Sequence, residues 1–241
     1  MSADSPLEIH TLPLFPLHCV LFPQFPLKLH VFEERYRAMI TRCIEDNAPF
    51  GVVLIREGEE VGAPAVPYEV GCLARILAVK RLEDGRMFLL AAGESRFRLL
   101  DYMEADLPYL IGRIQLVEDV PTESLTLPAC AQETAALFQR YLVLLADRAR
   151  LALPAVELPE DPQLLGFCIA SVAQFPLPDK QRLLEMTDTQ ERLETEIAFL
   201  RALVAELEAT PAPTPGGAAA VAVPVDPEAA HWLQYRQSSR N

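Results

Sequence analysis

Hydrophobic and polar residues follow different periods in the two halves of the chain. In the first half, short apolar runs are interrupted by proline, glycine and charged residues, which is typical of strands. One exception, around residues 32–44, has apolar residues at helical spacing and charges on the other side. Beyond residue 122 the period is helical. The pattern therefore predicts an α+β protein, with strands first and helices second.

The first half is expected to form about six strands, which would close into a small barrel and so hide the sheet edges. Asp84-Gly85, between two alternating runs, is a strong hairpin signal. The expected strands lie at 12–17, 20–22, 51–55, 69–82 with 86–92, 96–99 and 109–117. We therefore predict an antiparallel β-barrel with one helix inserted.

The second half is expected to form a bundle of about four helices. The first covers 129–147, and Asp161 followed by Pro162 predicts the start of the second. Pro176 and Pro178 are expected to end that helix, and Asp179 to cap the next. Asp188 with Glu191 resembles a capping box, and it precedes an apolar seam from Leu193 to Leu207 that packs against the other helices or against a partner.

These patterns divide the chain into four parts. We expect a β-barrel subdomain at 8–120 and a helical subdomain at 121–208. Residues 209–227 are rich in proline, alanine and glycine, which predicts a flexible linker. The tail at 228–241 contains Trp232, which is the only tryptophan of the chain.

Composition limits the class of protein. The chain has 241 residues and a net charge of −13, which disfavours general binding to nucleic acid. This length leaves no room for an ATPase module plus a second catalytic domain. The five cysteines form no CxxC motif, and the first residues lack a basic signal-peptide region. Prolines interrupt the longest uncharged run, at 11–27, so we expect no membrane span and a cytoplasmic location.

Motifs for catalysis are missing from the sequence. It contains no phosphate-binding GxxxxGK[ST] loop, no GxSxG elbow and no HExxH pair. Serines and lysines are few, and no spacing recommends a Ser-Lys dyad. The four histidines lack the paired spacings of structural zinc sites. The sequence therefore predicts no catalytic, metal or cofactor site.

A binding surface is the better-supported kind of site. Between residues 15 and 25, apolar side chains are packed between prolines, and strands of period two cannot turn all of them inward. An exposed apolar strip beside an open strand edge would capture an extended peptide by strand addition. The alternative is that the barrel closes and its helix covers these side chains. We call these residues the apolar strip: Phe15, Leu17, Leu21, Phe22 and Phe25.

An ordered set of motifs in the chain resembles one known family. The motifs are LPLFPL at 12–17, VLFP at 20–23, LHVFEERY at 29–36, FGVVLIREG at 50–58, VGCLARI at 70–76, GESRFR at 93–98, PY at 108–109, FPLP at 175–178 and KQRLLE at 180–185. Their order over residues 8–205 is similar to that of the Lon protease N-terminal domain, and most of all to its stand-alone bacterial form.

The resemblance implies a PUA-like β-barrel followed by a helical bundle. It also implies recognition of unfolded or tagged protein substrates, and self-association. Gln24 departs from the family pattern, which has glycine after Phe-Pro, so the turn there is expected to differ.

Three functions follow as hypotheses. The first is a non-catalytic protein-binding module for unfolded segments or a partner protein. The alternative is a small-molecule or RNA-binding barrel, which would use a local patch of basic residues on neighbouring strands. The third is a peptidase, which rests on the family name alone. The basic residues are Arg75, Lys80, Arg81, Arg86, Arg96 and Arg98.

Overall fold

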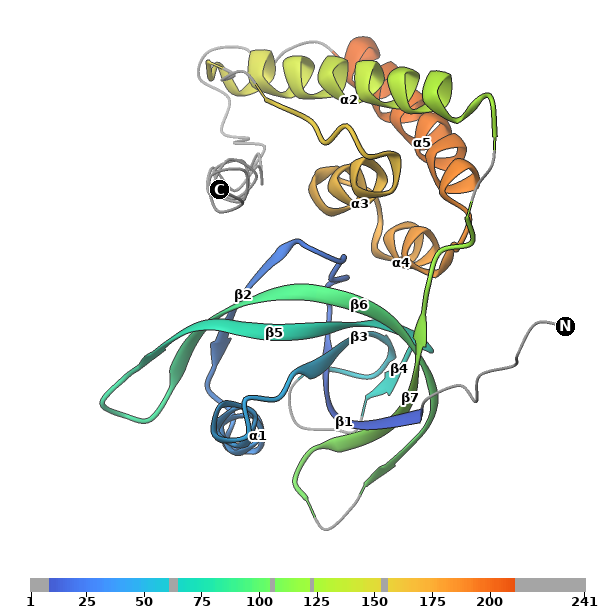
Figure 1. Ribbon diagram of the computed structural model, residues 1–241. Helices are drawn as coiled ribbons and strands as arrows, with labels where there is room; N and C mark the ends of the chain where they lie inside the picture. The colour runs from blue at the N-terminus through green and yellow to red at the C-terminus, as the bar shows by residue number, and fades with distance from the viewer. Residues whose placement is uncertain (1–8, 61–64, 105–106, 122–123, 153–155, 211–241) are drawn as a thin grey trace, which may run out of the picture. The chain divides into compact units, whose positions relative to one another are not determined.

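The computed structural model describes residues 9–60, 65–104, 107–121, 124–152 and 156–210. Within these ranges the chain forms a mixed sheet of seven strands and five helices (Figure 1). The strands are β1 (Ile9–Leu17), β2 (Pro26–Val31), β3 (Phe50–Glu57), β4 (Val66–Pro67), β5 (Val70–Arg81), β6 (Met87–Glu104) and β7 (Leu110–Val117). The helices are α1 (Glu34–Glu45), α2 (Leu127–Ala149), α3 (Pro162–Val172), α4 (Leu177–Glu185) and α5 (Thr189–Ala209).

The strand pairings form a closed circuit. β1 pairs with β7, and the ladder continues through β6, β5 and β3 back to β1. β2 adds to β6, and β4 adds to β3. The count is therefore seven strands rather than about six. The sheet is also not wholly antiparallel, because β1 and β3 run parallel. A parallel pair needs a long crossover, and the connection through β2 and α1 supplies it.

Two sequence expectations about the strands were wrong. Residues 20–22 lie in a loop rather than a strand, and the chain turns there with Gln24 at a φ of 69°. This left-handed conformation suits glycine, the residue that the resembling family has at this position. β2 was not expected, although its leucines and valine alternate with Lys28 and His30. The hairpin at Asp84-Gly85 is confirmed, and Gly85 has a φ of 82°.

Helix α1 packs its apolar face into the main core of the sheet. Its buried residues are Tyr36, Met39, Ile40 and Cys43. They join Phe15 and Leu17 of β1 in one hydrophobic cluster. A smaller cluster around Phe97 and Leu14 fills the other end of the sheet, where Gly51, Gly71 and Gly112 leave room for the side chains. Both clusters are formed by residues of the first half of the chain, and they make up the core of the sheet.

The described chain separates into two compact units. One contains residues up to Asp119 together with Pro176–Thr187, and the other contains Val120–Phe175 and the residues from Asp188 onward. Helix α4 thus belongs with the sheet, whereas the sequence assigned it to a helical subdomain at 121–208. Buried polar contacts explain the difference. Gln181 donates to the Val70 carbonyl at 2.9 Å, and Arg96 donates to the Leu184 and Met186 carbonyls and pairs with Asp119.

The second unit contains helices α2, α3 and α5. Phe138 and Tyr141 of α2 and Leu193 and Leu200 of α5 are buried in it. The predicted caps at Asp161 and Asp188 are confirmed, because each side chain accepts a hydrogen bond from the backbone three residues on. Asp179 is not a cap: it lies in the first turn of α4, which begins after Pro176.

The remaining predictions fall largely outside the described residues. The expected linker at 209–227 begins inside α5, which ends at Ala209. The rest of that segment and the tail at 228–241, with Trp232, lie outside the described part of the chain. Within the described part, no helix combines the length and the apolar character needed to span a membrane.

Candidate binding surface

The apolar strip is buried in the structure. The exposed fractions are 6% for Phe15 and Leu17, 4% for Leu21, 3% for Phe25 and 0% for Phe22. The ring of Phe15 stacks on Tyr36 with 4.1 Å between centroids. The prediction that these five side chains form an exposed surface is therefore wrong. They are core residues, covered by α1 and by their own loop.

The loop between β1 and β2 explains how so many consecutive apolar residues turn inward. This segment is not a strand, so its side chains need not alternate. It lies directly on β6, where Gln24 donates to the Gly93 carbonyl at 2.8 Å and Gly93 donates to the Phe25 carbonyl at 2.9 Å. A Cβ atom at Gly93 would lie 2.2 Å from the Phe22 carbonyl oxygen. Gly93 is therefore needed for this close approach.

Large apolar side chains are exposed at a different place. Phe32 is 49% exposed, Phe88 is 48% and Leu77 is 46%. The His30 ring stacks on Phe88 with 4.8 Å between centroids and lies 5.7 Å from the Phe32 ring. We call these four residues, His30, Phe32, Leu77 and Phe88, the aromatic surface. It is the candidate functional site of the sheet unit.

Strand register explains why these side chains point outward. His30, Phe88 and Lys80 form one cross-strand row over β2, β6 and β5. The next row, Val31, Met87 and Arg81, faces the opposite way, with Val31 and Met87 at 1% exposure. A register shift between Ile76 and Ala78 leaves Leu77 exposed. The hairpin thus has one core face and one aromatic face.

The sequence contained a signal for this surface that we missed. Leu27, Leu29 and Val31 alternate with polar residues and predict a half-buried strand. Phe32 then continues the outward series after Lys28 and His30. Phe32 is therefore an aromatic residue at a position where the alternation predicts a polar one, and this indicates an exposed ring. Phe88 can be recognised only once its register opposite His30 is known.

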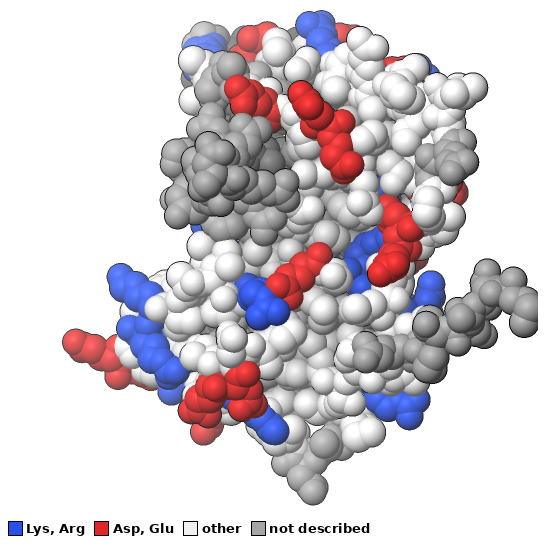
Figure 2. Space-filling view, viewed as in Figure 1, with Lys and Arg blue, Asp and Glu red and all other residues white. Residues whose placement is uncertain are grey.

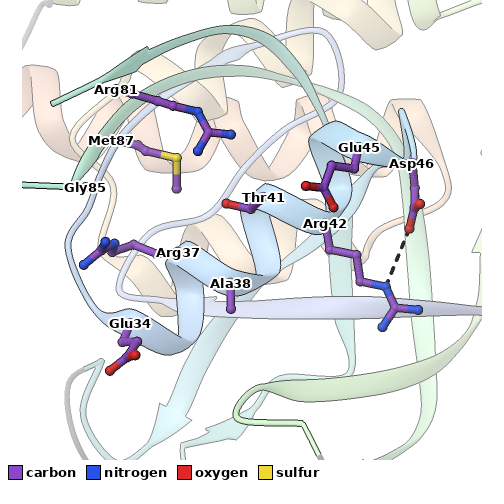
Figure 3. A pocket seen from close by; sticks show the side chains of 10 residues that line it. All are labelled: Glu34, Arg37, Ala38, Thr41, Arg42, Glu45, Asp46, Arg81, Gly85 and Met87. Carbon is purple, nitrogen blue, oxygen red and sulfur yellow. Dashed lines mark ion pairs between the residues drawn. The ribbon is translucent and has the colours of Figure 1, made fainter. Parts of the chain in front are cut away.

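A groove of about 600 Å³ lies on the other face of the hairpin, between α1 and the ends of β5 and β6. Figure 3 shows Arg81 reaching over α1 and Arg37 lying beside the turn at Gly85. Acidic and basic side chains are equally represented in its lining, and Arg42 is paired with Asp46 at 3.6 Å. Because the charges balance, the groove has no clear preference for a charged ligand.

The basic residues of the RNA hypothesis do not form a free patch. Arg75 pairs with Glu94, Arg86 with Asp84 at 2.7 Å, Arg98 with Glu69 at 3.7 Å, and the buried Arg96 with Asp119. Lys80 and Arg81 lie on opposite faces of β5. Figure 2 shows basic side chains with an acidic one beside them over the projecting hairpin, and acidic side chains over α1. Four of the six proposed residues are therefore already neutralised by acids.

Burial shifts the pKa of the thiols in the sheet unit away from reactivity, whereas it shifts the pKa of one lysine toward it. Burial raises the pKa of the Cys19 thiol to about 12 and that of Cys43 to about 11. Burial also lowers the pKa of Lys180 to about 8, and Cys19 lies close enough to oppose that shift. An activated nucleophile needs a lowered thiol pKa. The described residues also hold no group of three or more His, Cys, Asp and Glu side chains able to bind a metal ion.

Known proteins resemble this chain in both sequence and fold. "Lon protease 2" of Myxococcus xanthus is 29% identical over 192 residues, which are 78% of this chain and 23% of that protein. "Lon protease" of Koribacter versatilis is 30% identical over 197 residues, which are 79% of this chain and 24% of that protein. The chain therefore spans about a quarter of the length of the curated relatives that it matches.

Solved structures match over most of their length. A Lon N-terminal domain protein from Xanthomonas campestris has a TM-score of 0.61 and 27% identity, over 79% of this chain and 98% of that one. The N-terminal domain of Mycobacterium avium complex Lon protease has a TM-score of 0.59 at 19% identity, over 80% of this chain and 98% of that one, which shows a shared fold. The sequence model of the ATP-dependent protease La (LON) substrate-binding domain matches residues 11–202. The chain belongs to the LON substrate-binding domain family.

Proposed function

We propose that this chain is a non-catalytic protein-binding module that recognises unfolded polypeptide segments through its aromatic surface. The observation that carries the proposal is the group of Phe32, Leu77 and Phe88, each about half exposed: Leu77 and Phe88 lie on the paired strands β5 and β6, and the His30 ring contacts both Phe88 and Phe32. Single exposed apolar residues are ordinary, but a group of them on one face supports an interaction site. Membership of a family of substrate-binding domains supports the same conclusion.

The geometry suits an extended segment. Among the described strands, β2 pairs only with β6, so no described strand occupies its other edge, and we propose that a bound segment adds there. A segment added at that edge would place alternate side chains beside His30, whose ring stacks on Phe88, and toward Phe32, which directly follows β2. The strand provides hydrogen bonds that any sequence can make, and the aromatic rings favour apolar side chains. This combination fits a module that recognises unfolded protein rather than one partner surface.

Binding to a permanently unfolded probe tests the proposal. The probe is a reduced and carboxymethylated protein with a fluorescent label, titrated with the full chain and followed by anisotropy. Phe88→Ser and Phe32→Ser are expected to weaken binding about tenfold each, equivalent to about 1.4 kcal/mol. Tyr102→Ser is the matched control. Tyr102 is similarly exposed, at 42%, and also lies on β6, but in the part of that strand that pairs with β7 rather than with β2. Equal effects of all three variants, or no binding by the wild type, would overturn the proposal.

The peptidase hypothesis is tested by a separate assay. A binding module leaves labelled casein intact, with or without ATP, during hours of incubation with the purified chain. Release of labelled fragments at a rate proportional to the amount of chain would contradict the non-catalytic role. Repeating the assay with Phe88→Ser would show whether any cleavage depends on the aromatic surface.

A further inference from the structure

We propose that Glu196 is a protonated carboxyl group in the folded second unit, and that its ionisation as the pH rises loosens the packing of α5 on α3. Glu196 lies on α5, in the unit that contains α2, α3 and α5. All of the residues concerned belong to this unit, so the device is separate from the aromatic surface of the sheet unit. It makes the second unit a pH-sensitive part of the fold.

The Glu196 side chain is fully buried in an apolar part of the second unit. Its exposed fraction is 0%, and neither of its carboxyl oxygens has a hydrogen-bond partner within the described part of the chain. Leu193 and Leu200 lie three and four residues away on the same face of α5, and both are also at 0%. A carboxylate buried in this way costs far more free energy than a neutral carboxyl group. Burial therefore favours the protonated form.

Helix α3 approaches the carboxyl group closely at Gly166. A Cβ atom at this glycine would lie 3.5 Å from Oε1 of Glu196 and 3.3 Å from Cδ of Arg192. The carboxyl group thus lies near the α3 backbone. Gly166 is the fifth residue of α3, so its N–H group bonds within the helix. The backbone of α3 therefore provides no donor to stabilise a carboxylate at this point.

One buried cation lies near Glu196. Arg192 is one turn earlier on α5 and is also 0% exposed. Its guanidinium carbon lies over the Phe167 ring, 4.3 Å from the ring centroid. Burial raises the pKa of Glu196 well above the ordinary value of 4.5, and the charge of Arg192 opposes only part of this shift. The neighbouring guanidinium is thus not sufficient to keep the carboxyl group ionised.

Thiol groups face the carboxyl group from the other two helices. Burial, and next the nearby Glu196, raise the pKa of the Cys168 thiol on α3 to about 12. On α2, burial and next Glu194 raise the pKa of the Cys130 thiol, with smaller contributions from Glu133 and Glu196. Glu133 and Glu194 are themselves exposed. Both thiols are therefore neutral near pH 7, and neither supplies a charge that would stabilise a buried carboxylate.

The raised pKa sets the direction of the pH effect. Because the folded-state pKa of Glu196 is higher than the ordinary value of 4.5, its stabilisation of the fold is complete below pH 4.5. The stabilisation declines as the pH rises toward the folded-state pKa. In that range the equilibrium for opening of α5 increases by about tenfold for each pH unit. We therefore expect α5 to open more readily at pH 7 than at pH 5, relative to a chain that lacks this carboxyl group.

Hydrogen exchange of the full chain, resolved by mass spectrometry of peptides, tests this expectation. The wild type and Glu196→Gln are compared at pH 5, 6 and 7, so that the intrinsic exchange rates cancel at each pH. The ratio of the wild-type to the variant exchange rate in α5 is expected to increase about tenfold or more between pH 5 and pH 7. A ratio that stays constant over this range would overturn the proposal.

Two further variants control for side effects of the substitution. Glu194→Gln removes an exposed carboxylate two residues away on α5 and is expected to keep the wild-type dependence on pH. Glu196→Met places an apolar side chain at the buried position and is expected to lose that dependence, as Glu196→Gln does. It serves as the test if the amide variant does not fold. Loss of the dependence in Glu194→Gln, or its retention in Glu196→Met, would contradict the role of Glu196.

Infrared difference spectroscopy reports the protonation state of the carboxyl group directly. At pH 6 the difference between the wild type and Glu196→Gln is expected to contain the carbonyl band of a neutral carboxyl group. The difference between the wild type and Glu194→Gln is expected to contain carboxylate bands instead. Carboxylate bands in both difference spectra would show that Glu196 is ionised in the folded chain, which overturns the proposal.

Discussion

The apolar strip and the aromatic surface use the same kinds of side chain with opposite results. Phe22 and Phe25 of the strip are at most 3% exposed, whereas Phe32 and Phe88 are nearly half exposed. Leu21, Phe22 and Phe25 of the strip lie in a loop that folds onto β6, where Gly93 permits the approach, and Phe15 and Leu17 lie at the end of β1. His30 and Phe88 lie at outward positions of paired strands, and Phe32 directly follows β2. Apolar character alone does not locate a binding surface; the direction set by the backbone does.

The largest expected effect is on stability at the strip. Phe22→Ala removes a fully buried ring and is expected to lower the free energy of unfolding by about 3–5 kcal/mol. Phe88→Ala removes a half-exposed ring and is expected to cost less than about 1 kcal/mol. Urea denaturation followed by circular dichroism measures both. Similar losses of unfolding free energy for the two variants would contradict the distinction between the buried apolar strip and the exposed aromatic surface.

A second contrast lies on β6 itself. Arg96 is buried and bonds to Asp119 and to two carbonyls at the end of α4, whereas Arg98 pairs with Glu69 at the surface. Arg96→Ala leaves these partners without their donor and is expected to cost about 3 kcal/mol. Arg98→Ala is expected to cost less than about 1 kcal/mol. Urea denaturation measures both losses. An Arg96→Ala variant as stable as the wild type would show that α4 does not depend on this contact.

The buried cluster that holds the strip also predicts a pH dependence. Burial raises the pKa of Cys43 from 9.0 to about 11. Since the folded-state pKa is the higher one, the stabilisation is complete below pH 9 and is lost as the pH rises from 9 to 11. The loss attributable to this thiol is about 2 kcal/mol. Urea denaturation at pH 8, 9 and 10 should show a shallower decline for Cys43→Ala; parallel declines would contradict the assignment.

The smallest effect concerns the hairpin that presents the aromatic surface. Gly85 has a φ of 82°, and a Cβ atom there would meet the end of the Arg37 side chain. Gly85→Ala is therefore expected to cost about 1 kcal/mol. Thermal unfolding measures this loss. The double variant Gly85→Ala with Arg37→Ala separates the two causes of this loss, which are backbone strain at Gly85 and the contact of the new Cβ atom with Arg37. If the second substitution restores stability, the contact rather than the φ angle causes the loss.

Local signals in the sequence were sufficient for several elements. Asp84-Gly85 specifies its own turn, and Asp161 and Asp188 cap the helices that follow them. Such features depend on residues within a few positions of one another. The membership in the LON substrate-binding domain family was also accessible from the ordered motifs, and the match over residues 11–202 confirms it.

Features that depend on distant residues were not predictable in the same way. The parallel pairing of β1 with β3 and the docking of α4 on β5 join segments far apart in the chain. The aromatic surface requires the register of β2 against β6, which no local pattern specifies. The burial of the strip required the contact of Phe22 with Gly93, about 70 positions away. Side-chain direction was therefore the part that the sequence left open.

Hydroxyl-radical footprinting tests the central claim most directly, because it reports the solvent exposure of individual side chains. In the free chain, Phe32 and Phe88 should be oxidised rapidly and Phe22 and Phe25 slowly. Addition of the reduced and carboxymethylated protein should protect Phe32, Phe88 and Leu77 severalfold and leave Tyr102 unchanged. Protection confined to Tyr102 or to the helices of the second unit, with Phe32 and Phe88 still oxidised at the free rate, would contradict the assignment of the aromatic surface as the binding site.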